Sequence, residues 1–461
     1  MKSLSTRTGL PQNFTLMGYQ KLIVLSISLC LCFSLFGQDL TTPLLSGSWQ
    51  STFSNPALIA KLPGKITVGL PGVYNDLFAE NFTYNDLLVE ENGRTFLDAN
   101  RGIALLEEQN QIRDDIDFES VGIAIRGKRW SFGLQHRLRY QAGVEFPKTL
   151  AQVIWEGNAQ FIGQTVDIAP QFQVFGYHEL GLTAAFQLNE QLSIGGRIKY
   201  LSGISDASSV AGGRLMLTTD GEAYDLTLDQ DYTINSSGSF AYNGLDGIET
   251  DFDFANVTFN NFIGTNSGIG FDLGAQLDLG NIRLQAAALD LAAQISWEDN
   301  VRNYRLEGEE AFTGLDVLQD LLDDTTSFAG LLDSLEMQFE PTETNTGYST
   351  DIGTRFLLGG ELDVNDQLTL GALLFYQDRP LVSEPSVVLS GRYRLMDNLI
   401  AGATYSYRAG SATNIGLNLT AGLGPVRLLL ATDNIITAIQ PKDSNRANVR
   451  IGLSLSFLED Q

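Results

Sequence analysis

The two histidines of the chain, His136 and His178, have the side chains best suited to acid–base chemistry, because imidazole titrates near neutral pH. A serine hydrolase would need one of them beside a serine nucleophile and an acidic or amide partner. The chain has no Gly-x-Ser-x-Gly motif, and no serine is singled out by its context. We therefore expect no catalytic residues and interpret both histidines as residues of the interior or the rim of the fold.

Metal and cofactor sites are not indicated either. The acids at Asp114–Asp117 and Asp323-Asp324 offer oxygen ligands for Ca²⁺, but neither group has the spacing of a calcium-binding loop. The pairs Gly195-Gly196 and Gly212-Gly213 lack phosphate-loop spacing and are interpreted as sites of close approach or curvature. We expect no bound metal and no cofactor.

The N-terminus predicts export. Leu22–Phe36 is an apolar run behind Lys21, and both cysteines of the chain lie within it. A run of this length is too short for a comfortable helical span but fits the core of a signal peptide. We assign residues 1–37 to a cleavable signal peptide, with Met1 or Met17 as the start. The alternative is an N-terminal anchor.

The overall charge limits the partners. The formal net charge is -26 and the sequence pI is about 4.3, with no run of Lys and Arg. A polyanion would be repelled, so we expect no nucleic-acid partner.

From Val121 onward the chain falls into alternating segments of nine to eleven residues with polar turns between them. Short turns on one side and longer connections on the other are typical of transmembrane barrels. No segment after the leader has 18 consecutive apolar residues, so an exported, membrane-bound chain must span with a closed sheet. The fold predicted is all-β: a transmembrane antiparallel β-barrel of about 14 strands, with 12 to 16 plausible, an N-terminal plug and a few short helices.

The prediction divides the mature chain in two. Residues 38–118 form an N-terminal plug that includes two short helices within Phe82–Asp115, and residues 119–461 form the barrel. Two long acidic loops, 221–266 and 298–347, are placed on the extracellular side, and Gly314–Phe339 has leucines near helical spacing.

Several cations fall on predicted strands, often on the polar face. Because charge is costly in a lipid-facing band, these side chains should point into the lumen or lie near an interface. The predicted lumen charges are Arg126, Arg137, Arg139, Arg197, Lys199, Arg392 and Arg394.

The segment Asn55-Pro56-Ala57-Leu58 opens the plug, and a physical reading is that Asn55 caps a helix whose first residue is Pro56. With the Asp433-Asn434 and Asn448–Leu453 motifs near the end of the chain, this segment resembles the DUF5723 outer-membrane barrels of Bacteroidetes. That family is similar to FadL-like barrels and to the PorV/PorQ group. The resemblance covers most of the chain after Gln38.

This resemblance implies a protein of the cell outer membrane and not an enzyme. A FadL-like channel or transporter for hydrophobic or small solutes is the first expectation, with outer-membrane lipid and a hydrophobic small molecule as partners. The alternative is a PorV/PorQ-like accessory factor of type IX secretion or surface-protein assembly, with secretion-system components as partners.

Overall fold

The computed structural model describes residues 40–91, 94–222, 225–238, 240–242, 248–250, 263–312, 341–379, 381, 383–408 and 411–459. The predicted signal peptide and the segment Gly314–Phe339, whose leucines predicted a helix, lie outside the described residues. Among the described residues, no helix is long and apolar enough to cross a membrane.

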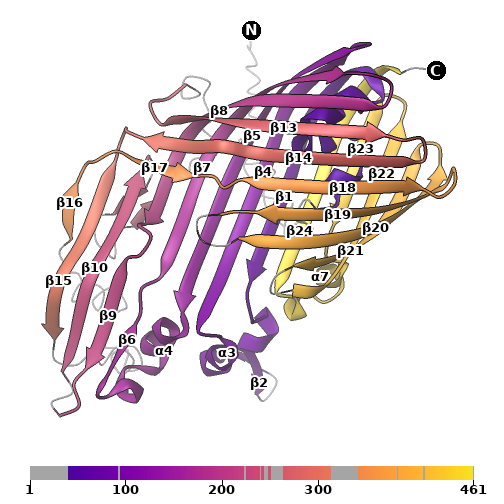
Figure 1. The fold of residues 1–461 in the computed structure, drawn as a ribbon. Helices are drawn as coiled ribbons and strands as arrows, with labels where there is room; N and C mark the ends of the chain where they lie inside the picture. Colours follow the sequence, from indigo (N-terminus) through magenta and orange to yellow (C-terminus); the bar gives the residue numbers. More distant parts are fainter. Residues whose placement is uncertain are drawn as a thin grey trace, which may run out of the picture.

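A closed antiparallel wall of 14 strands makes up most of the molecule, which confirms the predicted fold class and strand number (Figure 1). Each wall strand pairs with the next one along the chain, and the last pairs with the first, for example through Val68↔Leu455. The wall strands are β1 (Gly64–Ala79), β4 (Gln109–Arg126), β5 (Trp130–Pro147), β7 (Gln171–Gln187), β8 (Leu192–Ser209), β13 (Ser267–Asp278), β14 (Ile282–Trp297), β18 (Arg355–Asp363), β19 (Leu368–Gln377), β20 (Glu384–Met396), β21 (Leu399–Arg408), β22 (Ser411–Leu423), β23 (Val426–Thr432) and β24 (Arg446–Glu459).

The two ends of the barrel differ. Tight turns such as Gly127–Arg129 and Gly424-Pro425 join strands at one end, here called the turn end. The longer segments lie at the opposite end, the connection end. They include a sheet that projects beyond the wall beside helix α4 (Lys148–Glu156), at the lower left of Figure 1. Its strands are β6 (Gln164–Asp167), β9 (Arg214–Thr219), β10 (Leu226–Ser237), β15 (Arg302–Phe312) and β16 (Thr342–Thr344), while β17 (Tyr348–Asp351) continues the pairing of β14.

The segment predicted as plug is divided in the structure. Only its first part lies inside the barrel, in the short helices η1 (Thr42–Leu44), α2 (Ser51–Ser54) and η2 (Pro56–Lys61). β1 and the first half of β4 belong to the wall, because their residues alternate between buried and outward-facing positions as in the other strands.

The predicted helices of Phe82–Asp115 are η3 (Tyr84–Leu87) and α3 (Ala99–Leu105), with the hairpin β2 (Leu88–Glu91) and β3 (Arg94–Leu97) between them. The remaining small elements are η4 (Ala159–Phe161), β11 (Phe240–Tyr242), β12 (Ile248–Thr250), α7 (Ile435–Ile439) and η6 (Pro441–Asp443).

The outer face of the wall is apolar. On β4, for example, Val121, Ile123 and Ile125 are exposed, whereas Gly122 and Ala124 face inward and are buried. The same alternation recurs on the other wall strands and gives an apolar band around the barrel, with the polar side chains gathered inside.

Candidate functional site: the barrel interior and its wall

Residues 40–62, here called the plug, fill the interior at one level of the barrel. Most of them are buried, and Trp49 and Phe53 pack edge to face at the centre of one apolar cluster with Ile59 and Leu62. Leu40 and Leu44 belong to a second cluster with the wall residues Leu289, Leu357, Leu373, Phe375 and Val388. This second contact explains why the Leu368–Phe375 segment is apolar on both faces.

The Asn55–Leu58 motif anchors the plug. The Asn55 side chain accepts the main-chain N–H of Ala57 at 3.0 Å, with Pro56 as the first residue of η2, which confirms the predicted cap. The amide group of Asn55 also donates to the carbonyl of Ala275 on β13 at 3.1 Å. Asn55, Pro56, Ala57 and Leu58 therefore join a helix start to the wall.

Glycines form the seat of the plug. A Cβ atom on Gly195 would lie 2.5 Å from the main-chain nitrogen of Ala57, and one on Gly274 would collide with Asn55. Gly195 and Gly274 are direct partners on β8 and β13. Trp49 lies in the same way over a second glycine pair, Gly69 and Gly122, which face each other on β1 and β4. Gly195 thus serves the close approach of the plug, not curvature of the strand.

A network of buried ion pairs surrounds the plug on the β4–β8 side. Arg137 bonds to Glu179 at 2.6 Å, and Arg139 bonds to Asp117 at 2.9 Å. The Arg137 guanidinium also lies over the ring of Phe53, 4.6 Å from its centroid. The network therefore links three wall strands to the plug. Such pairing is needed because an isolated charge buried here would be costly.

The network continues to β13 and β14. Arg197 pairs with Asp272 at 2.9 Å and donates to the main-chain carbonyl of Thr52 in the plug. Lys199 pairs with Asp272 at 2.7 Å and with Asp290 at 2.5 Å. Four of the predicted lumen charges are thus brought together around the plug: Arg137, Arg139, Arg197 and Lys199.

The other three predicted lumen charges lie at or near the turn end. Arg126 donates to the main-chain carbonyl of Pro63 at 3.2 Å. Arg392 pairs with Glu361, and Arg394 is exposed. Both arginines line a polar cavity at the turn end of about 820 Å³. Further buried cations, absent from the prediction, are Arg113, Arg408, Arg446 and Arg450. In β24 the alternation of Arg446, Asn448 and Arg450 was a signal for two of them.

A small cavity lies beside the plug, here called the interior cavity, of about 40 Å³. One side is apolar, formed by Leu40, Leu289, Leu357 and Phe375; the other is charged, formed by Asp115, Asp117, Arg139, Arg355 and Arg379. In the closed structure this cavity has room for only a few water molecules, so a hydrophobic solute would have to displace a lining residue of the plug, such as Leu40, to contact both sides.

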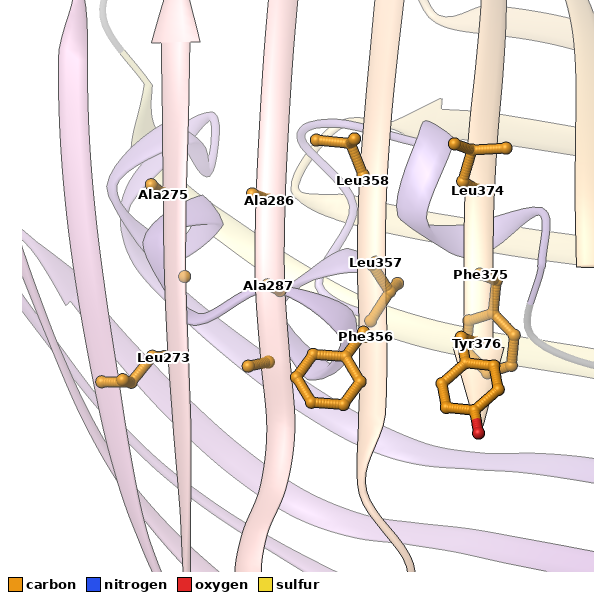
Figure 2. Close-up of a pocket in the computed structure, with 12 residues that line it drawn as sticks. Leu273, Ala275, Ala286, Ala287, Phe356, Leu357, Leu358, Leu374, Phe375 and Tyr376 are labelled. Carbon is orange, nitrogen blue, oxygen red and sulfur yellow. The ribbon is translucent and has the colours of Figure 1, made fainter. Parts of the chain in front are cut away.

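On the opposite side of the same wall lies an apolar depression of about 550 Å³, here called the outer groove. Figure 2 shows the short side chain of Ala286 on β14 between Ala275 and the larger Leu358, and one step along the same face Ala288 pairs with Leu273 and Phe356. Leu357 and Phe375 line both the outer groove and the interior cavity. One layer of strands therefore separates the two.

β14 is irregular next to these two spaces. Asp290 and Ala292 have positive φ values of 57° and 52°, which are uncommon for residues other than glycine. The β13–β14 register shifts on both sides of Phe271↔Leu291, and pairing with β18 stops at Leu289↔Arg355. Asp290 forms ion pairs with Lys199 and with Arg355, and the Asp290–Arg355 distance is 2.6 Å.

The histidines are placed differently from the prediction. His136 and His178 lie on β5 and β7 as expected, but both belong to the outward row of their strands, between residues such as Leu134 and Leu182 that are exposed on the apolar band. The prediction of interior or rim histidines was wrong, because the alternation of short segments does not reveal which face is the outer one. Among the described residues, no three His, Cys, Asp or Glu side chains are grouped to hold a metal ion.

Beyond the apolar band, at the connection end of β8, Asp206 is a buried acid. It accepts hydrogen bonds from Thr350 and Tyr348, each at 2.8 Å, and from Ser208 at 2.9 Å. Burial raises the pKa of Asp206 to about 6, although these hydrogen bonds oppose the shift.

The sequence matches one family model over residues 56–433, and that model is described as a family of unknown function, DUF5723. No curated protein matches the sequence.

Solved structures that match this chain include two toluene transporters and a FadL homologue. The Ralstonia pickettii toluene transporter TbuX is 11% identical, with a TM-score of 0.44, over 89% of this chain and 94% of that one. The Pseudomonas putida toluene transporter TodX is 10% identical, with a TM-score of 0.43, over 90% and 95%. A Pseudomonas aeruginosa FadL homologue is 11% identical, with a TM-score of 0.39, over 93% and 96%.

Proposed function

This chain belongs to the DUF5723 family, as its sequence predicted, and from that premise we propose that it is an outer-membrane barrel that carries hydrophobic or small solutes. The proposal places the connection end outside the cell and the turn end in the periplasm, since long connections of such barrels are extracellular. An origin in Bacteroidetes stays a prediction.

The observation that carries the proposal is the pair of spaces on either side of the β14–β18–β19 wall. A solute that displaced Leu40 of the plug would meet apolar side chains on one side of the interior cavity and charged groups on the other, and the outer groove offers an apolar surface at the level of the band. Because Leu357 and Phe375 contribute to both, the distance between the two is one strand layer.

The irregular part of β14 supports a sideways route. Residues 290–293 have interrupted pairing with both neighbouring strands, so fewer ladder hydrogen bonds oppose a local displacement there. A solute in the interior cavity would leave through this part of the wall into the outer groove, while the plug keeps the straight path through the barrel closed.

The test separates binding from passage with two neighbouring leucines, Leu357 facing the interior cavity and Leu358 facing the outer groove. The probe is an apolar naphthylamine dye whose fluorescence rises in apolar surroundings. Leu357→Asn should weaken saturable dye binding about tenfold, since an unpaired polar group there costs about 1–3 kcal/mol. Leu358→Asn should leave binding unchanged and slow dye entry into protein-containing vesicles.

The absence of saturable binding in the folded protein, or equal binding by both variants, would overturn the proposal. The folded state is checked by gel migration, because a closed barrel runs faster unheated than heated. The alternative of a secretion accessory factor has no specific observation in its favour, and a pull-down that recovers translocon or cargo proteins is the result that would restore it.

A further inference from the structure

The only two histidines of the chain meet one serine on the outer face of the barrel. The hydroxyl oxygen of Ser120 lies 2.6 Å from Nδ1 of His136, and Nε2 of His136 lies 3.1 Å from Nδ1 of His178. The three residues come from β4, β5 and β7, and the two imidazole rings are stacked with centroids 5.2 Å apart. They form a continuous polar line across three strands.

This polar line lies within the apolar band. Val121 beside Ser120, Leu134 two positions from His136, and Leu182 four positions from His178 are all exposed on the outer face, and His178 itself is covered by its neighbours. His136 lies about 20 Å along β5 from Trp130 at the turn end, at about 3.3 Å per residue. In a tilted strand, that puts it past the middle of an apolar band about 25 Å tall. An ionisable group in such a position is costly to maintain and usually marks a functional site.

A β-bulge directs Ser120 toward His136. Along β4 and β5, Glu119 pairs with Arg137 and Val121 with His136, so Ser120 is the extra residue. The ladder between β1 and β4 is interrupted at the same place, between Gly69↔Gly122 and Gly72↔Glu119. Bulges re-aim side chains and are frequent beside active sites, and this one supplies a hydroxyl at hydrogen-bond distance from an imidazole nitrogen.

One arrangement of protons satisfies both hydrogen bonds. If Nε2 of His136 carries the proton and donates it to Nδ1 of His178, then Nδ1 of His136 is the ring nitrogen that accepts the Ser120 hydroxyl. His178 thereby fixes the tautomer of His136 and stabilises its imidazolium form, the role that the third member of a nucleophile–base relay performs.

We propose that Ser120, His136 and His178 form an esterase site that faces the membrane and takes acyl esters of lipids as substrates. The Ser120 oxygen attacks the ester carbonyl carbon while its proton passes to Nδ1 of His136. The carbon–oxygen bond to the alcohol then breaks, and the alcohol leaves with that proton. Water releases the fatty acid from Ser120 by the reverse proton transfers. The inference does not depend on solute transport.

The test uses the full-length protein in detergent micelles with an alkyl fluorophosphonate, which labels activated serines, and a long-chain nitrophenyl ester. The label should be found on the peptide that contains Ser120. Ser120→Ala should abolish labelling and lower ester hydrolysis by about 10³-fold or more, and His136→Ala should have a similar effect.

Ser202 on β8 provides the matched control. It pairs with His178 in the β7–β8 ladder and is buried, and its hydroxyl has no hydrogen-bond partner among the described residues. Ser202→Ala should leave labelling and hydrolysis unchanged.

His178 is a positioning residue, and its variants test that role. His178→Ala should lower the rate and shift its pH dependence, whereas His178→Gln, which keeps an acceptor for Nε2 of His136, should restore part of both. If the heat-modifiable protein is not labelled at Ser120 between about pH 6 and pH 9, or if Ser120→Ala hydrolyses the ester at the wild-type rate, the proposal is overturned.

Discussion

At the scale of single residues, glycines in the wall allow the plug to pack closely against it. Gly195 and Gly274 allow the main chain of η2 to approach the wall to a distance that any Cβ would prevent. A Cβ on the neighbouring Gly196 would make only ordinary van der Waals contact, with its nearest atom 3.8 Å away. Adjacent glycines on one strand therefore have different tolerances.

Gly195→Val should displace the plug and destabilise the folded barrel by about 1–3 kcal/mol, as overpacking of a filled core does. Gly196→Val, on the outer face, is the control and should leave stability unchanged. The measurement is the temperature at which the fast-migrating unheated gel band disappears. If the band disappears at the same temperature in both variants, Gly195 is not needed for the packing of the plug against the wall.

Asp206 should make stability depend on pH. The folded-state pKa of about 6 exceeds the ordinary value of 3.8, so the folded protein binds the proton more tightly than the unfolded chain. Stability should therefore fall as pH rises from about 4 to about 6, by about 2–3 kcal/mol, and stay level above that window.

Asp206→Asn keeps the side-chain shape without the charge, so it should be more stable than the wild type at pH 7 and similar at pH 4. Unfolding temperatures at both pH values, wild type against variant, provide the comparison. An equal difference at both pH values would show that the charge of Asp206 is not the cause.

At the scale of elements, the sequence predicts strands better than it predicts what lies inside them. The alternation of residues such as Ile194, Ile198 and Arg197 on β8 follows from the period of a strand, and it led to the strand number that the structure has. The extent of the plug was overestimated, because β1 and the start of β4 carry Asp, Arg and Glu on an inward face that only the lumen explains.

The ion-pair partners inside the barrel depend on the register between neighbouring strands, which the sequence does not reveal. Arg137 and Glu179 are 42 positions apart and meet only because Leu138 pairs with His178 on the adjacent strands. The outward position of the histidines has the same origin, since a shift by one residue exchanges the two faces of a strand.

Removal of the plug tests its role as an element. A chain without residues 40–61 should keep a heat-modifiable wall but conduct ions in planar bilayers, because the plug clusters with Trp49 and Leu44 would no longer fill the interior. The full-length protein, measured in the same bilayers, should conduct far less. Equal currents would mean that the plug does not close the barrel.

At the scale of the whole molecule, the four tryptophans lie in different places relative to the apolar band, so their fluorescence can test whether that band contacts lipid. Trp130 is exposed on the outer face, whereas Trp49 lies in the plug and Trp297 is fully buried. Trp155 lies on α4 at the connection end. Of these four residues, Trp130 alone is positioned beside the band.

In lipid vesicles, a variant that keeps only Trp130, with the others replaced by Phe, should be strongly quenched by brominated acyl chains. A variant that keeps only Trp49 should not be, because the wall lies between it and the lipid. Equal quenching of the two would mean that the outer face of the barrel is not in contact with lipid.

The pairing of β1 with β24 has a consequence for biosynthesis. Because β1 pairs with β24, the barrel can close only after the last strand has been synthesised. A chain that ends early has two strand edges without hydrogen-bond partners and cannot close. The plug precedes β1 in the chain and must already be in place when the two edges meet. Closure is thus a checkpoint on chain length: a shortened product keeps exposed edges that proteases and chaperones can recognise.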